Sequence, residues 1–231
     1  MDEKYEHIFF DLDRTLWDFD ENSKKVLNDI YVNFKLNDSI SSSNLFVVKY
    51  QEINEYLWGL YRDDKLTKEE LRWKRFKDTL LYFNISDKEL PIHMGDYYVE
   101  NSPIQTLLFP NSIEVLDYLS KKYKLHIITN GFEEVQHIKL KESGLRDYFD
   151  VLIFSESAGV KKPHPYIFKK ALKKAGAKSS NSIMIGDDLY ADIYGAQRVN
   201  MDNIYFNPNK TEHDKYVQYE INCLSKLFEI L

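Results

Sequence analysis

Short runs of apolar residues alternate with amphipathic stretches along most of this 231-residue chain. Five of the runs are rich in Ile, Val, Phe and Leu, and each is short enough to be a strand buried on both faces of a parallel sheet. They are HIFFDLD at 7–13, KLHIITN at 124–130, DVLIFSE at 150–156, SIMIGDD at 182–188 and NIYFNP at 203–208. The pattern therefore predicts an α/β protein with a parallel sheet at its core.

Amphipathic helices are predicted between these strands. One helix is predicted from Ile113, Leu116 and Leu119, which repeat at three-residue spacing. At its start, the NSIE motif offers Asn111 as a cap and Glu114 as the partner in a capping box. A second helix is predicted through PYIFKKALKKAG, because Pro165 favours a first helical turn and Gly176 favours a helix end. Strands that alternate with helices are typical of right-handed crossovers, so we expect a doubly wound, Rossmann-like parallel sheet.

Residues 20–100 break the alternation, since they hold helix-like patterns and no convincing strand. One face gathers apolar and aromatic side chains at helical spacing, and TKEE at 67–70 predicts the start of another helix. The members of that face are Ile53, Tyr56, Leu57, Leu60 and Tyr61. We therefore expect a helical domain over residues 20–100, inserted after the first strand, and a core domain formed by residues 1–19 and 101–231.

Composition and charge exclude several classes of protein. The chain carries 31 basic and 37 acidic residues, a net charge of -6, so it offers nothing to a nucleic-acid polymer. Its single cysteine, Cys223, excludes a disulfide framework within the chain and fits a reducing compartment. The N-terminal MDEKYEH lacks the apolar core of a signal peptide, and no apolar stretch approaches the roughly 18 residues of a membrane helix. We expect a cytoplasmic monomer or homodimer without a membrane partner.

Polar residues that suit a binding site follow the predicted strands. Ligands of an open parallel sheet bind outside the carboxyl ends of its strands, so residues at those ends are the first candidates. The first strand ends in Asp11 and Asp13, the second in Thr129, Asn130 and Gly131, and the fourth in Gly186, Asp187 and Asp188, while Lys161 and Lys162 follow the third. Any one of them alone could be a solvated loop residue, whereas the whole set indicates a site.

These residues stand in four motifs that resemble those of the haloacid dehalogenase-like hydrolases. DLDRTLWDF, IITNG, KKP and GDDLYAD occur in the order of that family and with plausible spacings. The resemblance spans nearly the whole chain, because it implies a helical cap domain where the insert lies. It also implies a five-stranded core with strand order 5-4-1-2-3. As a cap, the insert would choose the substrate, since the core motifs contact only the phosphate.

The resemblance makes Asp11 the nucleophile of a phosphatase. A phosphate monoester is a dianion that a bare carboxylate repels, and Mg²⁺ prefers hard oxygen ligands such as those of Asp11 and Asp187. Of the two adjacent lysines, Lys162 is chosen over Lys161 as the catalytic cation because it directly precedes the proline, as in the family pattern. The phosphate-binding groups are expected to be Thr129, the backbone N–H groups of Asn130 and Gly131, and Lys162.

Asp13 lies two residues beyond Asp11, and side chains at that spacing along a strand share a face, so both acids can address one substrate. By the resemblance, Asp13 protonates the leaving oxygen, then deprotonates the water that attacks the aspartyl phosphate, and lends its backbone carbonyl to the metal. The resemblance also matches Asp192 to an acid that orients metal-bound water or Lys162. Asp188 is a further candidate for such a supporting role.

Four residues have two readings each: Arg14, Trp17 and Phe19 within the first motif, and His164 directly after KKP. Arg14 could contact substrate or form an outward salt bridge. Trp17 and Phe19 could stack on a base, although packing against the insert is the more frequent fate of such rings. His164 could touch a ligand, but a loop histidine without a metal-ligand partner is more often structural.

Within the family, DLDRTLWDF and the size of the insert most resemble the pyrimidine nucleotidases, which implies a nucleoside 5′-monophosphate as the substrate, with pyrimidines preferred. The alternatives are a phosphoglycolate or sugar-phosphate phosphatase, a phosphosugar mutase, a 2-haloacid dehalogenase and a non-catalytic binding module. Asp13 weighs against the dehalogenase, because displacing a halide needs no acid at the leaving group. The chain gives no sign of the water exclusion that a mutase needs. A pure scaffold need not keep Asp11, Asp13, Thr129, Lys162 and Asp187.

Overall fold

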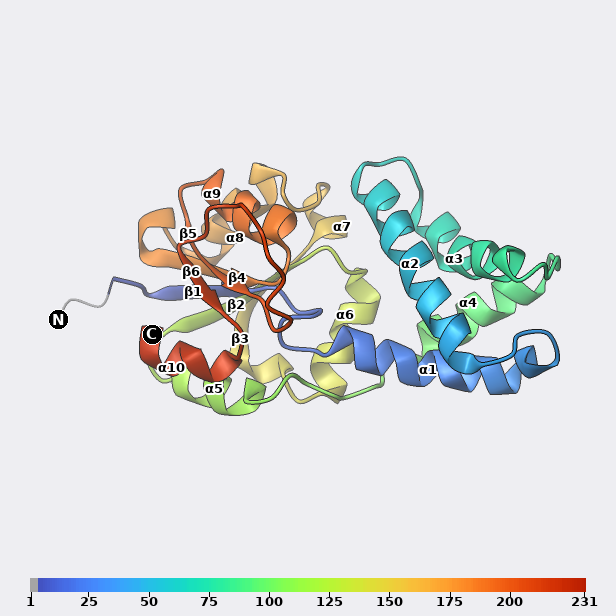
Figure 1. Ribbon diagram of the computed structural model, residues 1–231. Coiled ribbons are helices and arrows are strands. Elements are labelled where there is room, and N and C mark those ends of the chain that lie inside the picture. The colour runs from blue at the N-terminus through green and yellow to red at the C-terminus, as the bar shows by residue number, and fades with distance from the viewer. Residues whose placement is uncertain (1–3) are drawn as a thin grey trace. The chain divides into compact units, whose positions relative to one another are not determined.

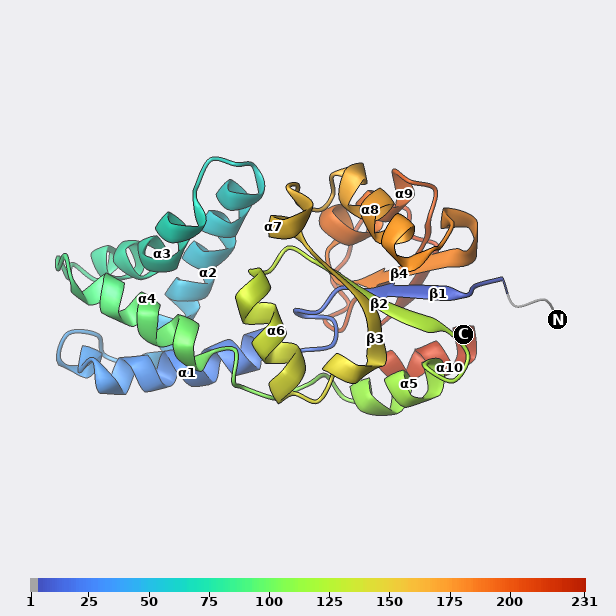
Figure 2. The same ribbon diagram turned by 180° about the vertical axis from the view of Figure 1, so that it is seen from behind.

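The computed structural model describes residues 4–231, and one of its two compact units is built on a parallel sheet (Figure 1, Figure 2). The strands are β1 (His7–Phe10), β2 (Lys124–Thr129), β3 (Phe149–Phe154), β4 (Ser182–Gly186), β5 (Asp202–Phe206) and β6 (Tyr219–Ile221). Their order is β3-β2-β1-β4-β5-β6, and every neighbouring pair is parallel. The five predicted strands and their order are confirmed, and β6 extends the sheet beyond β5.

Helices cover both faces of the sheet in this unit, which runs up to Phe19 and resumes over Thr106–Leu231. They are α5 (Ser112–Leu119), α6 (Glu133–Glu142), α7 (Ser155–Ala158), α8 (Pro165–Ala175), α9 (Gly195–Gln197) and α10 (Leu227–Ile230). Successive residues of β1 point to opposite faces, so Ile8 and Phe10 join the core under α5 and α10, whereas Phe9 joins the core under α8 and α9 (Figure 1). The unit is therefore the predicted doubly wound, Rossmann-like α/β fold.

The two helix ends predicted in this unit have different outcomes. α8 begins at Pro165, and Gly176 follows it in a left-handed conformation with φ 65°, as its sequence indicates. At α5, Asn111 also takes a left-handed conformation, with φ 67°, and its side chain caps no backbone N–H group. A capping side chain reaches the first turn from an extended backbone, so the capping box predicted for Asn111 and Glu114 is wrong.

The second unit spans Asp20–Gln105 and is built from helices, with no strand among these residues. The helices are α1 (Phe19–Asn33), α2 (Ser43–Arg62), α3 (Lys68–Tyr82) and α4 (Leu90–Asn101). Thr67 caps α3 and forms the predicted capping box with Glu70. Tyr50, Phe76 and Tyr98 pack ring against ring in a core that belongs to this unit alone. Within residues 4–231, none of the helices is both long and apolar enough to cross a membrane.

The buried face of α2 is displaced from the predicted one. Leu57 and Tyr61 are buried as expected, but Tyr56 is 66% exposed. The residues that α2 buries are Phe46, Val47, Tyr50, Asn54, Leu57 and Tyr61. The sequence pattern does not define the limits of the buried face, because aromatic residues occur at exposed as well as buried positions of this helix.

Two histidines on the neighbouring strands β1 and β2 lie buried against each other. His7 Nδ1 and His126 Nε2 are 3.0 Å apart, and the two rings stack with their centroids 5.3 Å apart. Burial lowers the pKa of His126 to about 4, and the nearby His7 and Lys124 act in the same direction. Burial also lowers the pKa of His7. Both rings are therefore neutral in the folded protein near pH 7.

We predict that this pair makes the protein less stable at pH 5 than at pH 7. The unfolded chain protonates His126 as the pH falls below 6.5, whereas the folded chain resists protonation until about pH 4. Stability that is fully present above pH 6.5 is thus lost as the pH falls, by about 2 kcal/mol at pH 5 from His126 alone. Urea unfolding of His126→Phe should show a pH dependence smaller by that amount. His93→Phe, at an exposed position, is the control, and an unchanged pH dependence in His126→Phe would contradict the assignment.

Candidate active site

The predicted catalytic acids and hydroxyl group meet at one edge of the sheet. Asp11 directly follows β1, Thr129 is the last residue of β2, and Asp187 directly follows β4. β1 lies between β2 and β4, and the Asp11 N–H donates to the carbonyl of Ile185 at 2.9 Å. Parallel pairing therefore brings three carboxyl ends together, as the sequence analysis expects.

Lys162 is a buried cation at this edge. Its Nζ donates at 2.6 Å to Asp11 Oδ1, at 2.6 Å to Asp192 Oδ1 and at 2.8 Å to the carbonyl of Ile128, which uses all of its N–H groups. Burial disfavours the charge on Lys162, but the carboxylates of Asp11 and Asp192 outweigh burial and raise its pKa. The ammonium group is therefore charged at neutral pH and held against Asp11.

Asn130 fixes the backbone that carries Lys162. Its Oδ1 accepts a hydrogen bond from the Lys162 N–H at 2.7 Å, and its Nδ2 donates to the Lys162 carbonyl at 3.1 Å. Only the backbone N–H of Asn130 is predicted from the sequence to serve the site, so the role of its side chain is an addition. It explains how Lys162, rather than the half-buried Lys161, is brought to the carboxylates.

Three carboxylates gather around this point, and two of them, Asp11 and Asp192, bind the buried lysine. Asp11, Asp187 and Asp192 each offer one oxygen, and the three oxygens lie within 4.8 Å of one another. Burial raises the pKa of all three groups, and repulsion adds to it, since Asp192 raises the pKa of Asp11 and Asp11 raises that of Asp187. A set of hard oxygen ligands this crowded with negative charge fits a divalent cation such as Mg²⁺. Asp192, which is predicted only to orient metal-bound water or Lys162, therefore joins the two predicted carboxylate ligands, Asp11 and Asp187.

The segment after β4 places Asp192. Asp188 caps the helical turn that follows, with its Oδ1 accepting from the N–H groups of Tyr190 at 2.8 Å and Ala191 at 2.9 Å. The Asp188 N–H donates to Asp192 Oδ2 at 3.1 Å. Asp192 approaches β4 so closely that a Cβ at Gly186 would lie 2.3 Å from its Oδ2, which explains the glycine at that position. Asp188 supports the site through this turn.

Two residues of α6 that the sequence analysis misses hold the carboxylate of Asp13. Lys139 forms an ion pair with Asp13 Oδ1, and Gln136 Nε2 donates to Asp13 Oδ2 at 2.8 Å. Gln136 Nε2 also donates to Thr129 Oγ1 at 2.8 Å. The charge of Asp13 raises the pKa of Asp11, so the two acids are electrostatic neighbours. The signal available in the sequence is the i, i+3 spacing of Gln136 and Lys139, which puts both on one face of a helix.

The backbone of Gly131 lies beside the hydroxyl group of Thr129. Its N–H donates to Thr129 Oγ1 at 3.0 Å, and its role as a phosphate ligand stays a prediction. A Cβ at position 131 would lie 2.3 Å from Gln136 Nε2. Glycine is required here because the side chain of Gln136 fills the space beside the backbone.

The residues with two readings are now placed. Trp17 is 0% exposed and packs in the core, with Lys139 Nζ 4.0 Å from the centroid of one of its rings, so the stacking of a base on Trp17 is excluded. Arg14 has a left-handed backbone with φ 62°, and its guanidinium carbon lies 4.8 Å from the centre of the Phe19 ring. His164 caps α8, since its Nδ1 accepts from a backbone N–H of that helix at 3.2 Å. The structural reading of His164 is confirmed.

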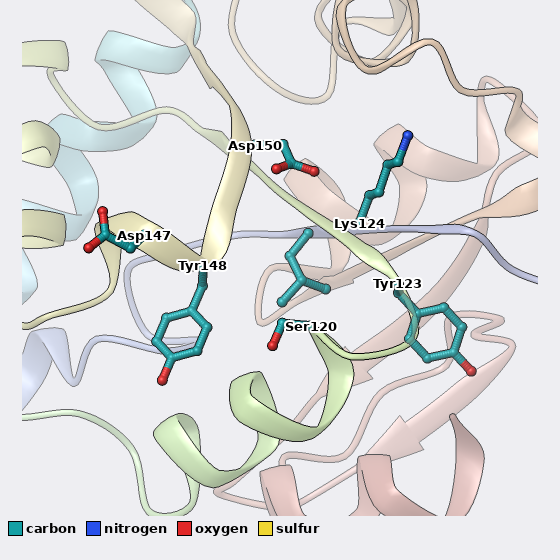
Figure 3. Close-up of a pocket in the computed structure, with 7 residues that line it drawn as sticks. Ser120, Tyr123, Lys124, Asp147, Tyr148 and Asp150 are labelled. Atoms are coloured by element: carbon teal, nitrogen blue, oxygen red, sulfur yellow. The ribbon is translucent and has the colours of Figure 1, made fainter.

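A separate cavity of about 420 Å³ lies at the opposite edge of the sheet (Figure 3). Residues near the amino ends of β2 and β3 line it, among them Lys124, Tyr148 and Asp150. None of the predicted site residues contributes to its lining. The cavity is therefore not part of the candidate active site.

Comparison with known proteins supports the family resemblance of the sequence. The family model described as haloacid dehalogenase-like hydrolase matches residues 8–206. Pyrimidine 5′-nucleotidase YjjG of Escherichia coli is 30% identical over 99% of this chain and 98% of its own length. Glyceraldehyde 3-phosphate phosphatase of Pyrococcus furiosus is 41% identical, over 53% of each chain. Among solved structures, the HAD-hydrolase YfnB of Bacillus subtilis bound to magnesium matches with a TM-score of 0.89 and 26% identity, covering 98% of each chain.

Proposed function

Because this chain belongs to the haloacid dehalogenase-like hydrolase family and has phosphatases among its relatives, we propose that it is a magnesium-dependent phosphatase of nucleoside 5′-monophosphates, with pyrimidines preferred. The observation that carries the chemistry is the contact of Asp11 with the buried Lys162, beside Asp187 and Asp192. A carboxylate nucleophile, a fixed cation and a set of metal ligands at one point are what phosphoryl transfer needs. Hydrolysis then passes through an aspartyl phosphate on Asp11.

Charge balance accounts for the binding of a phosphate dianion. Asp11 and Asp187, with Asp192 beside them, would hold the magnesium ion, which supplies positive charge against the carboxylates and the phosphoryl oxygens. Lys162 adds its own charge, because its raised pKa keeps it protonated at neutral pH. The acids of the site can then face a dianionic substrate without net repulsion.

The side chains of the protein supply the nucleophile and the proton transfers. In the first half-reaction, an Asp11 oxygen attacks phosphorus, the bond from phosphorus to the leaving oxygen breaks, and Asp13 donates a proton to that oxygen. In the second, Asp13 takes a proton from water, the water oxygen attacks phosphorus, and the bond to Asp11 breaks to release phosphate. Asp11 returns as a carboxylate and Asp13 as an acid, ready for the next substrate.

Thr129 has a proton to offer to the phosphoryl group. Its Oγ1 accepts hydrogen bonds from the Gly131 N–H at 3.0 Å and from Gln136 Nε2 at 2.8 Å. Both lone pairs of the hydroxyl oxygen are therefore in use. The hydroxyl proton is left to be donated, which supports the role of Thr129 as a ligand of a phosphoryl oxygen.

The choice of substrate is supported by likeness over the whole chain. YjjG, a pyrimidine 5′-nucleotidase by name, matches over 99% of this chain. A sugar- or triose-phosphate phosphatase is the second candidate, favoured by the 41% identity to glyceraldehyde 3-phosphate phosphatase, although that match covers 53% of the chain. We assign the choice among substrates to the helical unit Asp20–Gln105 as a cap domain, because the phosphate-binding groups all belong to the other unit.

We predict that kcat/KM for dUMP and dTMP exceeds that for AMP, phosphoglycolate, glyceraldehyde 3-phosphate and a hexose phosphate by about tenfold or more. A tenfold preference corresponds to about 1.4 kcal/mol of transition-state binding. Phosphate release with Mg²⁺ present measures it, and an Asp11→Asn protein purified in parallel reports any contaminating phosphatase. A tenfold preference for a sugar or triose phosphate would overturn the nucleotide assignment and leave the phosphatase assignment intact.

A further inference from the structure

Both oxygens of the Asp13 carboxylate are occupied by side chains of α6, one by Lys139 and one by Gln136. We propose that Lys139 and Gln136 are positioning residues of the reaction, which hold Asp13 at the leaving oxygen and couple it to Thr129. The inference rests on the acid–base role proposed for Asp13. It assigns a function to two residues that lie outside the four sequence motifs.

The buried Lys139 serves to position the Asp13 carboxylate more than to stabilise the fold. Its side chain is only 4% exposed, and its Nζ lies 4.0 Å from the centroid of a Trp17 ring and 5.5 Å from that of Phe19. Asp13, its partner, keeps 25% of its side chain exposed. Burying an ammonium group costs its hydration, and an ion pair of this kind returns little net stability. Aromatic walls hold the lysine in place, and its charge in turn restricts the more exposed carboxylate.

Gln136 links the acid–base residue to the phosphate-binding hydroxyl. A carboxylate only accepts hydrogen bonds, so the buried amide must turn its nitrogen toward Asp13. The same nitrogen donates at 2.8 Å to Asp13 Oδ2 and at 2.8 Å to Thr129 Oγ1. One atom therefore sets the offset between the group that binds a phosphoryl oxygen and the group that protonates the leaving oxygen. A fixed offset of this kind is what a positioned general acid requires.

This coupling has a consequence that depends on the leaving group. The oxygen of an alkyl phosphate such as a nucleoside monophosphate needs a proton as it departs, whereas p-nitrophenolate departs without one. A displaced Asp13 should therefore slow the alkyl phosphate much more than p-nitrophenyl phosphate. Both substrates share the phosphoryl group and Asp11, so damage to the fold or to phosphate binding would lower both rates alike.

The test compares kcat/KM for the best alkyl phosphate and for p-nitrophenyl phosphate, because this ratio reports the steps up to departure of the leaving group. Lys139→Met is expected to lower kcat/KM for the alkyl phosphate by about 100-fold and for p-nitrophenyl phosphate by less than about tenfold. Lys139→Arg should recover most of the loss, since it restores the charge. Gln136→Leu should show the same selectivity and also raise KM for both substrates, because Thr129 loses a partner.

Lys141→Met is the matched control, since Lys141 lies on the same helix with its side chain 81% exposed, and it should behave as wild type. Asp13→Asn distinguishes failure of the acid–base role of Asp13 from failure of the positioning role of Lys139 and Gln136. If it shows no leaving-group selectivity, the proposed role of Asp13 fails. Thermal unfolding first shows that Lys139→Met and Gln136→Leu are folded. If Asp13→Asn is selective, but these two variants lose kcat/KM equally on both substrates or lose none, the positioning role is overturned. Should Lys139→Met not fold, Gln136→Leu carries the same test.

Discussion

Asp11→Asn is expected to lower kcat by about 10⁴-fold or more while the protein stays folded. The amide oxygen is a weak nucleophile, and the substitution also removes the negative charge whose Oδ1 lies 2.6 Å from Lys162 Nζ. Stability should not fall, because burial and the charges of Asp192 and Asp13 already disfavour the charged form of Asp11 and raise its pKa. Phosphate release under saturating substrate measures the loss, and thermal unfolding measures the fold.

Asp117→Asn is the control for this change, since Asp117 is an exposed acid on α5 outside the four motifs. Its Oδ1 accepts from the Tyr148 hydroxyl at 2.6 Å, a bond that the amide oxygen of Asn can also accept. It should keep wild-type turnover and a wild-type unfolding temperature. Near-normal hydrolysis by Asp11→Asn would remove the nucleophile from the mechanism. An unfolded Asp11→Asn protein would contradict the inference that the buried charge of Asp11 lowers the stability of the folded protein.

Removal of divalent metal is expected to lower the rate by about 100-fold or more. Three carboxylate oxygens lie within 4.8 Å of one another, one each from Asp11, Asp187 and Asp192. Burial and the charge of its neighbours raise the pKa of Asp187, and this negative charge would repel a phosphate dianion unless a cation compensates it. EDTA followed by dialysis should silence the enzyme, and Mg²⁺ should restore it. Full activity in a rigorously metal-free sample would contradict the proposed metal requirement.

Binding of the metal should also be visible without any substrate. Mg²⁺ should raise the unfolding temperature of the wild-type protein, because a ligand of the folded state stabilises it. Asp187→Asn should lose most of that rise, whereas Asp117→Asn should keep it. An equal rise in all three proteins would place the ion at another site.

The sheet was readable from the sequence because each buried parallel strand needs a short, continuous apolar run. Tyr219–Ile221 escaped prediction, since β6 is a three-residue edge strand with only Ile221 buried and carries almost no apolar signal. The end of α8 was readable from Pro165 and Gly176, which act through local backbone geometry. The capping box at Asn111 is wrong because a capping side chain acts from an extended backbone, whereas Asn111 is left-handed with φ 67°.

The acids of the site were readable because the ends of parallel strands converge whatever the details of the fold. Gln136 and Lys139 could not be read in the same way. They lie on α6 among charged residues that resemble a solvated helix face, yet both are buried in the folded protein. Their i, i+3 spacing puts them on one face of a helix, but it does not say that this face turns inward, which depends on the tertiary contacts of α6 with Trp17 and Asp13.

Trapping the phosphoenzyme tests the central claim most directly. Wild-type protein is mixed with Mg²⁺ and excess substrate, quenched in acid during turnover, digested and examined by mass spectrometry. The account predicts one added phosphoryl group on the peptide that contains Asp11, and none in Asp11→Asn treated in parallel. Release of phosphate by the wild-type protein with the phosphoryl group on another residue, or with no phosphoenzyme at any quench time, would contradict it.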